Sequence, residues 1–149
     1  MEIERKFLLR NDDWRKSVTN RIHIKQGYIC SDIDRVVRIR ITDSKAFITI
    51  KGKATQISHT EFEYEIPVKD AEEMYSLFCQ KANLEKYRNI VFYKNHKWEI
   101  DEFAGRHQGL VFAEVELQSE DEAIEFPDWI GQEITGIPKY YNSNLVKAE

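Results

Sequence analysis

The chain has little cysteine, no long apolar run and no excess of basic residues. Its two cysteines, Cys30 and Cys79, are too few for a disulfide framework and do not have metal-site spacing. No apolar stretch approaches the ~20 residues that cross a bilayer, and the acidic N-terminus lacks the regions of a signal peptide. The formal net charge of -4 argues against a protein that coats nucleic acid. We therefore expect a cytoplasmic protein without a membrane or nucleic-acid partner.

The size and composition are those of one folded unit. A chain of 149 residues with 42% hydrophobic and 32% charged residues is long enough to bury a core and too short for much more. It contains no repeat, linker or low-complexity tract, so we expect a single domain over residues 1–149. Either a monomer or a homodimer fits this composition.

Charged residues alternate with apolar ones from the start of the chain. Glu2, Glu4 and Lys6 stand at every second position, with Ile3 and Phe7 between or beside them. In a β-strand this spacing turns the charged side chains to one face and the apolar ones to the other.

The same alternation recurs along the chain, and each later segment carries charge of one sign. The basic rows are Arg38 with Arg40, Lys51 with Lys53, and Lys86 with Arg88. The acidic rows are Glu61 with Glu63 and Glu65, Glu99 with Asp101, and Glu114 with Glu116. Rows of a single sign on successive strands predict two charged zones on one face of a sheet.

The hydrophobic periodicity predicts a β-rich α+β fold. Strands are expected at about 1–9, 21–30, 35–42, 45–52, 57–66, 85–93, 96–103 and 110–117. An amphipathic helix is expected over 69–83, and a second helix should begin at Ser119 and end before Pro127. Shorter helices are expected at 11–17 and 141–148.

The charged rows can face either solvent or an enclosed interior. On a single strand, the ordinary interpretation is that charge faces water and the apolar row faces a core. The expected helices are too few to cover one whole face of a flat sheet of eight strands. We therefore favour an eight-stranded antiparallel closed barrel, a tunnel, with a charged lumen and the helices packed outside.

A charged lumen needs partners, because unpaired buried charges are costly. Phosphate groups suit the basic rows through charge-assisted, often bidentate bonds. Mg²⁺ or Mn²⁺ suits the carboxylates, since these hard ions take oxygen ligands and leave positions open for water and phosphate. The residues alone thus predict a small polyanionic, phosphate-chain partner and a divalent metal.

Several motifs resemble one known family, the CYTH domain or triphosphate tunnel metalloenzymes, and their spread covers nearly the whole chain. The hallmark is the Glu-x-Glu-x-Lys strand, here residues 2–6. Similar blocks are Gln-Gly-Tyr-Ile at 26–29, Val-Arg-Ile-Arg at 37–40, Thr-Ile-Lys-Gly at 49–52, Trp-Glu-Ile-Asp-Glu-Phe at 98–103, Ala-Glu-Val-Glu-Leu at 113–117, and the stretches 131–136 and 141–145.

The resemblance implies a tunnel fold and cleavage of triphosphate-containing molecules with Mg²⁺ or Mn²⁺. It implies that Glu2, Glu4 and either Glu114 or Glu116 hold a first metal. It implies that the anion is gripped by Lys6, Arg38, Arg40, Lys51, Lys53, Lys86 and Arg88. Glu61, Glu63, Glu99 and Asp101 would position a second metal, a water or the basic residues. The residues expected to act in catalysis are Glu2, Glu4, Lys6, Glu63 and Lys86.

The expected reaction is hydrolysis of the terminal phosphoryl group of inorganic triphosphate. Residues 21–28 look more like the compact bacterial forms than like the cyclases, which typically carry a histidine- and aromatic-rich motif early in the chain. A nucleoside or thiamine triphosphatase and an adenylate cyclase remain alternatives within the family. A non-catalytic polyphosphate- or nucleotide-binding module is an alternative of another class, and a barrel with an apolar interior for a small ligand is a third.

Overall fold

The computed structural model describes residues 2–32, 34–53 and 58–146, which form one curled antiparallel sheet with a few short helices. The strands are β1 (Glu2–Leu9), β2 (Asn20–Asp32), β3 (Arg35–Ile41), β4 (Ala46–Lys51), β5 (Ser58–His59), β6 (Glu61–Ile66), β7 (Asn83–Tyr93), β8 (His96–Phe103), β9 (Val111–Glu116) and β10 (Ile130–Glu133). The helices are α1 (Val68–Phe78) and α2 (Asn142–Leu145), and the 3-10 turns are η1 (Asp13–Ser17), η2 (Gly105–His107) and η3 (Pro138–Tyr140). None of the described helices has the length and hydropathy to cross a membrane.

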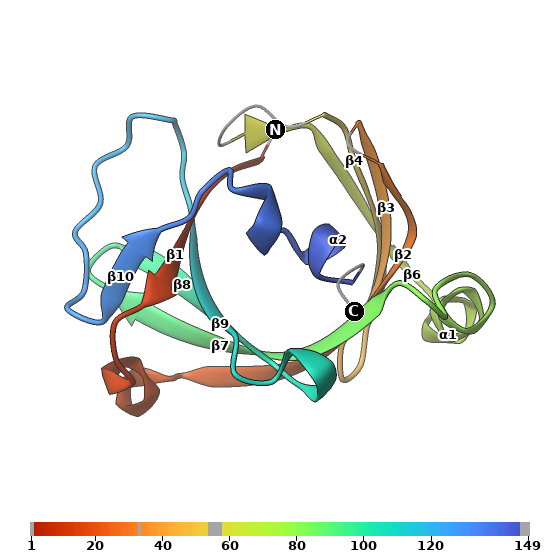
Figure 1. Ribbon diagram of the computed structural model, residues 1–149, viewed down its shortest axis with the longest axis horizontal. Helices are drawn as coiled ribbons and strands as arrows, with labels where there is room; N and C mark the ends of the chain where they lie inside the picture. The colour runs from red at the N-terminus through yellow and green to blue at the C-terminus, as the bar shows by residue number, and fades with distance from the viewer. Residues whose placement is uncertain (1, 33, 54–57, 147–149) are drawn as a thin grey trace.

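The sheet follows the order β10-β1-β9-β8-β7-β2-β3-β4-β6 and curls into a ring-like wall (Figure 1). The predicted α+β class is confirmed, whereas the eight-stranded closed barrel is wrong. The path has nine strands, a tenth strand, β5, pairs with β1, and no pairing joins β6 to β10 in the described part of the chain. The outer edge of β1 is shared between β5 at Glu2 and β10 at Phe7, so β6 finds no partner there.

Two elements near the C-terminus differ from the prediction. The helix expected from Ser119 is a loop, because the Glu122 carboxylate bonds the Gln118 amide and His96 in place of helical partners. Strand β10 was not predicted, because its four residues show no alternation and become a strand only by pairing with β1.

The expected helices form with shorter bounds. Helix α1 begins near the predicted residue but ends at Phe78, well before residue 83. The Asn83 side chain donates hydrogen bonds to the carbonyls of Cys79 and Gln80, so it closes this helix end and starts β7. The short helices expected at 11–17 and 141–148 correspond to η1 and α2, with 147–148 outside the described residues.

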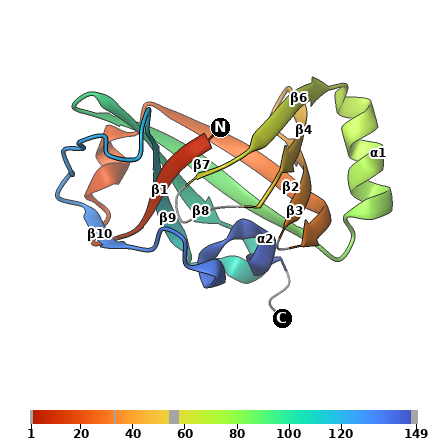
Figure 2. The same ribbon diagram turned by 90° about the horizontal axis from the view of Figure 1, so that it is seen from above.

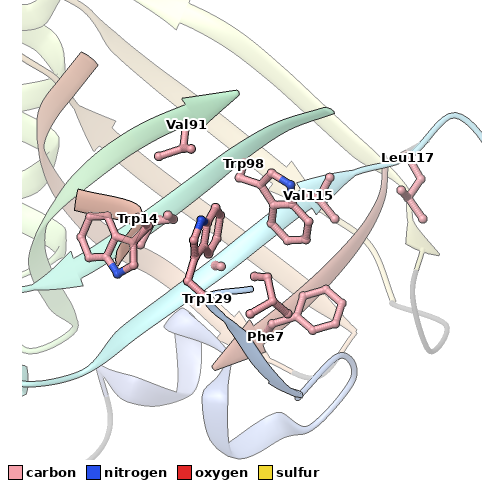
Figure 3. Packing of buried hydrophobic residues seen from close by; sticks show 10 residues of the cluster. Phe7, Trp14, Val91, Trp98, Val115, Leu117 and Trp129 are labelled. Atoms are coloured by element: carbon pink, nitrogen blue, oxygen red, sulfur yellow. The ribbon is translucent and has the colours of Figure 1, made fainter. Parts of the chain in front are cut away.

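The apolar rows of the strands pack on the outside of the ring, as the alternation predicted. One core joins Phe7, Trp98 and Val115 of the sheet to Trp14 of η1 and Trp129 of the loop before β10 (Figure 3). The indole rings of Trp98 and Trp129 meet edge to face, with centroids 5.8 Å apart. A second outer core lies beneath α1, which covers β3 and β4.

The inner face is charged over only part of its length, which the sequence did not predict. Leu84, Phe103 and Phe112 lie in the same inward rows as the charges and pack with Leu145 and Val146. We call Leu84, Phe103 and Phe112 the apolar floor. The C-terminal segment, residues 138–146, is seated on it, so α2 lies within the ring in Figure 1 and at one end of it in Figure 2.

Gly27 lies where β2 passes closest to the end of α1. A Cβ at residue 27 would come within 2.5 Å of Cys79 Cβ, which is backbone-anchored and cannot rotate away. We expect Gly27→Ala to destabilise the fold by about 1–3 kcal/mol through overpacking. Urea denaturation measures this change in the free energy of unfolding. Gly52→Ala is the control, because its nearest neighbour lies at 3.9 Å; equal effects of the two changes would contradict the prediction.

Candidate functional site

A cavity of about 670 Å³ lies inside the curled sheet. Its walls carry charged side chains from seven strands, and one end is lined by polar groups of the C-terminal segment. All of the predicted site residues except Glu99 and Asp101 line it: Glu2, Glu4, Lys6, Arg38, Arg40, Lys51, Lys53, Glu61, Glu63, Lys86, Arg88, Glu114 and Glu116. A lining of this kind contradicts the alternative of an apolar interior for a small ligand.

We call the side of the cavity formed by Arg38, Arg40, Lys86 and Arg88 the basic wall. Asp101 does not line the cavity but pairs with Lys86 and Arg88 of this wall. Its carboxylate accepts one bond from Lys86 at 2.7 Å and two from Arg88 at 2.8 and 2.9 Å. Although burial alone would raise it, the pKa of Asp101 is held well below its usual range by Arg88 and Lys86. Burial lowers the pKa of Lys86 to about 7, against the opposing effect of Asp101. This buried carboxylate therefore fixes both cations in place.

Arg40 is held by a neutral side chain. Its Nε donates a 3.0 Å hydrogen bond to Oε1 of Gln26, which is fully buried on the neighbouring strand. The amide nitrogen of Gln26 donates in turn to the Tyr28 hydroxyl at 2.6 Å. Burial, with Arg38 and Arg88 nearby, lowers the pKa of Arg40 to about 9, so it stays cationic at neutral pH. Its charge is thus oriented and not neutralised by this partner.

Arg38 has a donor, its Nε, that no group in the described part of the chain accepts from. Its terminal nitrogen bonds Thr49 at 3.1 Å and Glu63 at 3.4 Å, along one rung of β3, β4 and β6. Its Nε is buried and has no hydrogen-bond partner. Buried donors are rarely left unpaired in proteins.

Carboxylates face one another on the acidic side of the cavity. Glu4 lies directly opposite Glu116, and Glu99 lies directly opposite Glu114. Like charges in these positions destabilise a sheet. Burial first, then Glu114 and Glu2, raise the pKa of Glu4 well above its ordinary value. The acidic side therefore carries negative charge that the wall itself does not balance.

Glu4 and Glu114 interact through a hydrogen bond, yet their pKa values move in opposite directions. The pKa of Glu114 is lowered despite burial, because Lys6, Arg88 and Lys86 lie close to it. Glu4 therefore holds a proton more readily than Glu114 does.

The separation of charge into two zones is incomplete. Lys51 places its ammonium 3.3 Å from Glu2 and 3.5 Å from Glu61, inside the acidic side. Burial and the carboxylates Glu2, Glu99 and Glu61 still raise the pKa of Glu116. One lysine therefore offsets only part of the repulsion.

The carboxylates on β1 and β9 suit a hard divalent cation in type and charge. All are oxygen donors, and their mutual repulsion would be relieved by positive charge. Among the described residues, no three such side chains converge as a finished ligand set. Hard divalent cations of this kind can keep several waters and take only one or two carboxylates plus phosphate oxygens.

The sequence analysis quoted motifs that contain Gln26, Tyr28, Thr135, Tyr141 and Asn142 but assigned these lining or wall residues no role in the site. Gln26 and Tyr28 share the inward parity of their strand, so alternation extended to neutral polar residues would have found them. Asn142 reaches the cavity through the packing of the C-terminal segment, and the alternation of charged and apolar residues does not extend to it, although the motif at 141–145 contains it.

A curled antiparallel sheet with buried cations beside clustered carboxylates defines a protein that binds a polyanion together with a divalent metal. The model of the CYTH domain matches residues 1–145, and the chain belongs to this family, as its motifs predicted. CYTH triphosphate tunnel metalloenzymes are divalent-metal dependent.

Two curated relatives are similar over almost their whole length. An inorganic triphosphatase of Acetivibrio thermocellus is 47% identical over 146 residues, 98% of this chain and 93% of that protein. An inorganic triphosphatase of Nitrosomonas europaea is 32% identical over 148 residues, 97% of this chain and 95% of that protein. A crystal structure of an inorganic triphosphatase matches with a TM-score of 0.72 and 29% identity, covering 100% of this chain and 96% of that chain.

Removing the charge of Asp101 should destabilise the whole protein. Asp101→Asn leaves the buried Lys86 and Arg88 without their anion, and breaking a buried pair in this way costs about 3–5 kcal/mol. Guanidinium denaturation measures the loss. The control is Glu99→Gln on the same strand, whose ion pairs are long and partly exposed and should be worth less than about 1 kcal/mol. Similar losses for both variants would contradict this role of Asp101.

Glu4→Gln should stabilise the metal-free protein at neutral and alkaline pH. The folded state holds the Glu4 proton more tightly than the unfolded chain does, so wild-type stability is lost as pH rises through the raised pKa. The glutamine variant avoids this loss, and its melting temperature should exceed the wild-type value by a few degrees at pH 8, with roughly 2–4 °C per kcal/mol.

The advantage of Glu4→Gln should shrink as the pH approaches 4.5, the ordinary value for glutamate, because both folded and unfolded wild-type chains then hold the proton. Glu65→Gln, an exposed change on β6, is the control. A constant difference across the pH range would contradict the raised pKa of Glu4.

Proposed function

We propose that this protein is a divalent-metal-dependent inorganic triphosphatase that hydrolyses the terminal phosphoryl group of triphosphate. The observation that carries the proposal is one cavity that combines oriented, buried cations with carboxylates in excess on the opposite side. The names of both curated relatives agree with it, and so does the activity expected from the sequence motifs.

The basic wall would bind the phosphate chain. Arg38 offers its unpaired Nε, while Arg40 is oriented by Gln26 and remains charged. Lys86 and Arg88 are held by Asp101, so little reorganisation is needed when an anion enters. Phosphoryl transfer depends mainly on such alignment and charge stabilisation, with little covalent work for the protein. Asp101 acts here as a positioning residue for cations.

The carboxylates Glu2, Glu4, Glu114 and Glu116 would hold Mg²⁺ or Mn²⁺ beside the phosphates. When bound, either ion neutralises phosphate oxygens and orders water for attack. Glu61 and Glu63 line the same cavity from β6 and would position water or a second ion. Lys6 lies on β1 with Glu2 and Glu4, opposite Glu114, and would join the two sides of the site.

A non-catalytic polyphosphate-binding module fits the cavity less well. A pure anion binder gains nothing from carboxylates near phosphate, and Glu4 facing Glu116 costs stability without a cation. Triphosphate hydrolysis uses both sides of the cavity, whereas binding alone uses only the basic one.

Phosphate release tests the proposed activity directly. Wild-type protein should release phosphate from inorganic triphosphate with Mg²⁺ or Mn²⁺ and lose the activity in EDTA. Arg40→Ala and Glu116→Gln should each lower kcat/KM by roughly 100-fold or more, the usual effect of removing one preorganised charged group. Arg35→Ala is the matched control, because Arg35 lies on the same strand as Arg40 but is exposed and paired with Asp32.

A substrate panel separates the alternatives. Pyrophosphate, ATP and thiamine triphosphate should be hydrolysed more slowly than inorganic triphosphate at equal concentration. Faster turnover of ATP or thiamine triphosphate would assign the site to an organic triphosphate. Formation of cyclic AMP from ATP would identify a cyclase. Triphosphate binding without turnover across both metals would replace the enzyme by a binding module.

A further inference from the structure

The cavity is covered at one end by the C-terminal segment. Residues 138–146 lie within the ring in Figure 1 and at one end of it in Figure 2. Leu145 and Val146 are buried against Phe103 and Phe112 of the apolar floor. Two residues of η2 also hold the segment: Arg106 donates to the carbonyl of Val146, and His107 Nε2 bonds the carbonyl of Leu145. Burial and hydrogen bonding therefore hold this segment as a wall of the cavity.

Two lysines stand where the charged wall meets the apolar floor. The ammonium of Lys6 lies 4.6 Å from the centre of the Phe112 ring, and that of Lys86 lies 5.6 Å from the centre of the Phe103 ring. The C-terminal segment gives each ammonium one acceptor. Lys6 donates to the carbonyl of Tyr140 at 2.7 Å, and Lys86 donates to Oδ1 of Asn142 at 2.8 Å.

Asn142 also connects Lys86 to Arg40, through Gln26 on the neighbouring strand β2. Its Oδ1 accepts a second, longer bond of 3.4 Å from the amide nitrogen of Gln26. The same Gln26 accepts the bond from Arg40. A single side chain of α2 thus links strands β2 and β7 through the two amides.

The acceptor offered by Asn142 is neutral, and that determines what it can do. An ammonium has three donors, and the protein directs two of those of Lys86, one to Asp101 and one to Asn142. An amide oxygen orients the ammonium without cancelling its charge, whereas a second carboxylate would weaken its attraction for phosphate.

We propose that Asn142 is a positioning residue of the anion site, which aims the ammonium of Lys86 at the phosphate chain from the end wall formed by residues 138–146. This inference rests on the proposed function for the identity of the anion. It assigns to the C-terminal segment a part in substrate affinity, through Lys86, in addition to closing one end of the cavity.

Binding of triphosphate without metal tests the inference apart from catalysis. Isothermal titration calorimetry in EDTA should show about tenfold weaker binding for Asn142→Ala, the effect expected on losing a hydrogen bond to a charged group. With metal present, KM should rise by a similar factor while kcat falls by less than about threefold. The control is Gln132→Ala, an exposed amide deletion on β10, which should leave both quantities unchanged.

Asn142→Asp separates positioning from folding. The aspartate keeps an oxygen beside Lys86 and adds an ion pair, so the melting temperature should not fall. Triphosphate affinity should fall further than in Asn142→Ala, because the new charge repels phosphate and neutralises Lys86. This variant also decides the matter if Asn142→Ala unfolds. Wild-type affinity in Asn142→Asp, or in a folded Asn142→Ala, would overturn the proposal.

The two proposals fail in different ways. If the wild-type protein binds triphosphate in an Asn142-dependent manner but never releases phosphate, the enzymatic function is wrong and the positioning role stands. If the wild-type protein hydrolyses triphosphate and neither Asn142 variant changes Kd or KM, the function stands and the positioning role is wrong.

Discussion

The buried contact of Asp101 with Lys86 and Arg88 is the interaction on which the site depends. Burying the charge of Asp101 on β8 carries a large desolvation penalty, which its close partners Lys86 and Arg88 on β7 offset. The pairing removes freedom from two long side chains before any ligand arrives. An anion entering the cavity therefore meets cations whose geometry the protein has already established. The other cations of the basic wall, such as Arg40, add to the positive electrostatic potential around Lys86 and Arg88.

On the acidic side of the cavity, the charged groups face others of the same sign. Whereas Lys86 and Arg88 of the basic wall are paired with Asp101, the carboxylates of the acidic side face one another, with Glu4 opposite Glu116, and burial and neighbouring carboxylates raise the pKa of Glu4. Such an arrangement stores repulsion that a cation relieves. Lys86 and Arg88 thus have a counter-charge within the protein, whereas Glu4 and Glu116 face each other across two neighbouring strands. The asymmetry matches a site that requires both a polyanion and a metal.

The sequence predicted the inward charges well, because alternation has a period of two in every strand and leaves little freedom in the choice of face. It predicted less where structure depends on distant partners. Strand β10 forms by pairing with β1, and in the loop after Ser119 the Glu122 carboxylate accepts a hydrogen bond from the backbone amide of Gln118. Asn142 enters the cavity because an apolar floor receives α2. Sheet closure also failed as a prediction, because the edge of β1 is divided between two short strands.

The wall of the cavity is only one strand thick, and β2 shows what this entails. Gln26 faces inward and holds Arg40, while the next residue, Gly27, faces outward and touches Cys79 at the end of α1. Consecutive peptide units thus serve the ligand chamber and the exterior scaffold. Because no second layer of structure lies between these two faces of β2, the same few backbone torsions determine both how α1 packs and how the guanidinium of Arg40 is oriented.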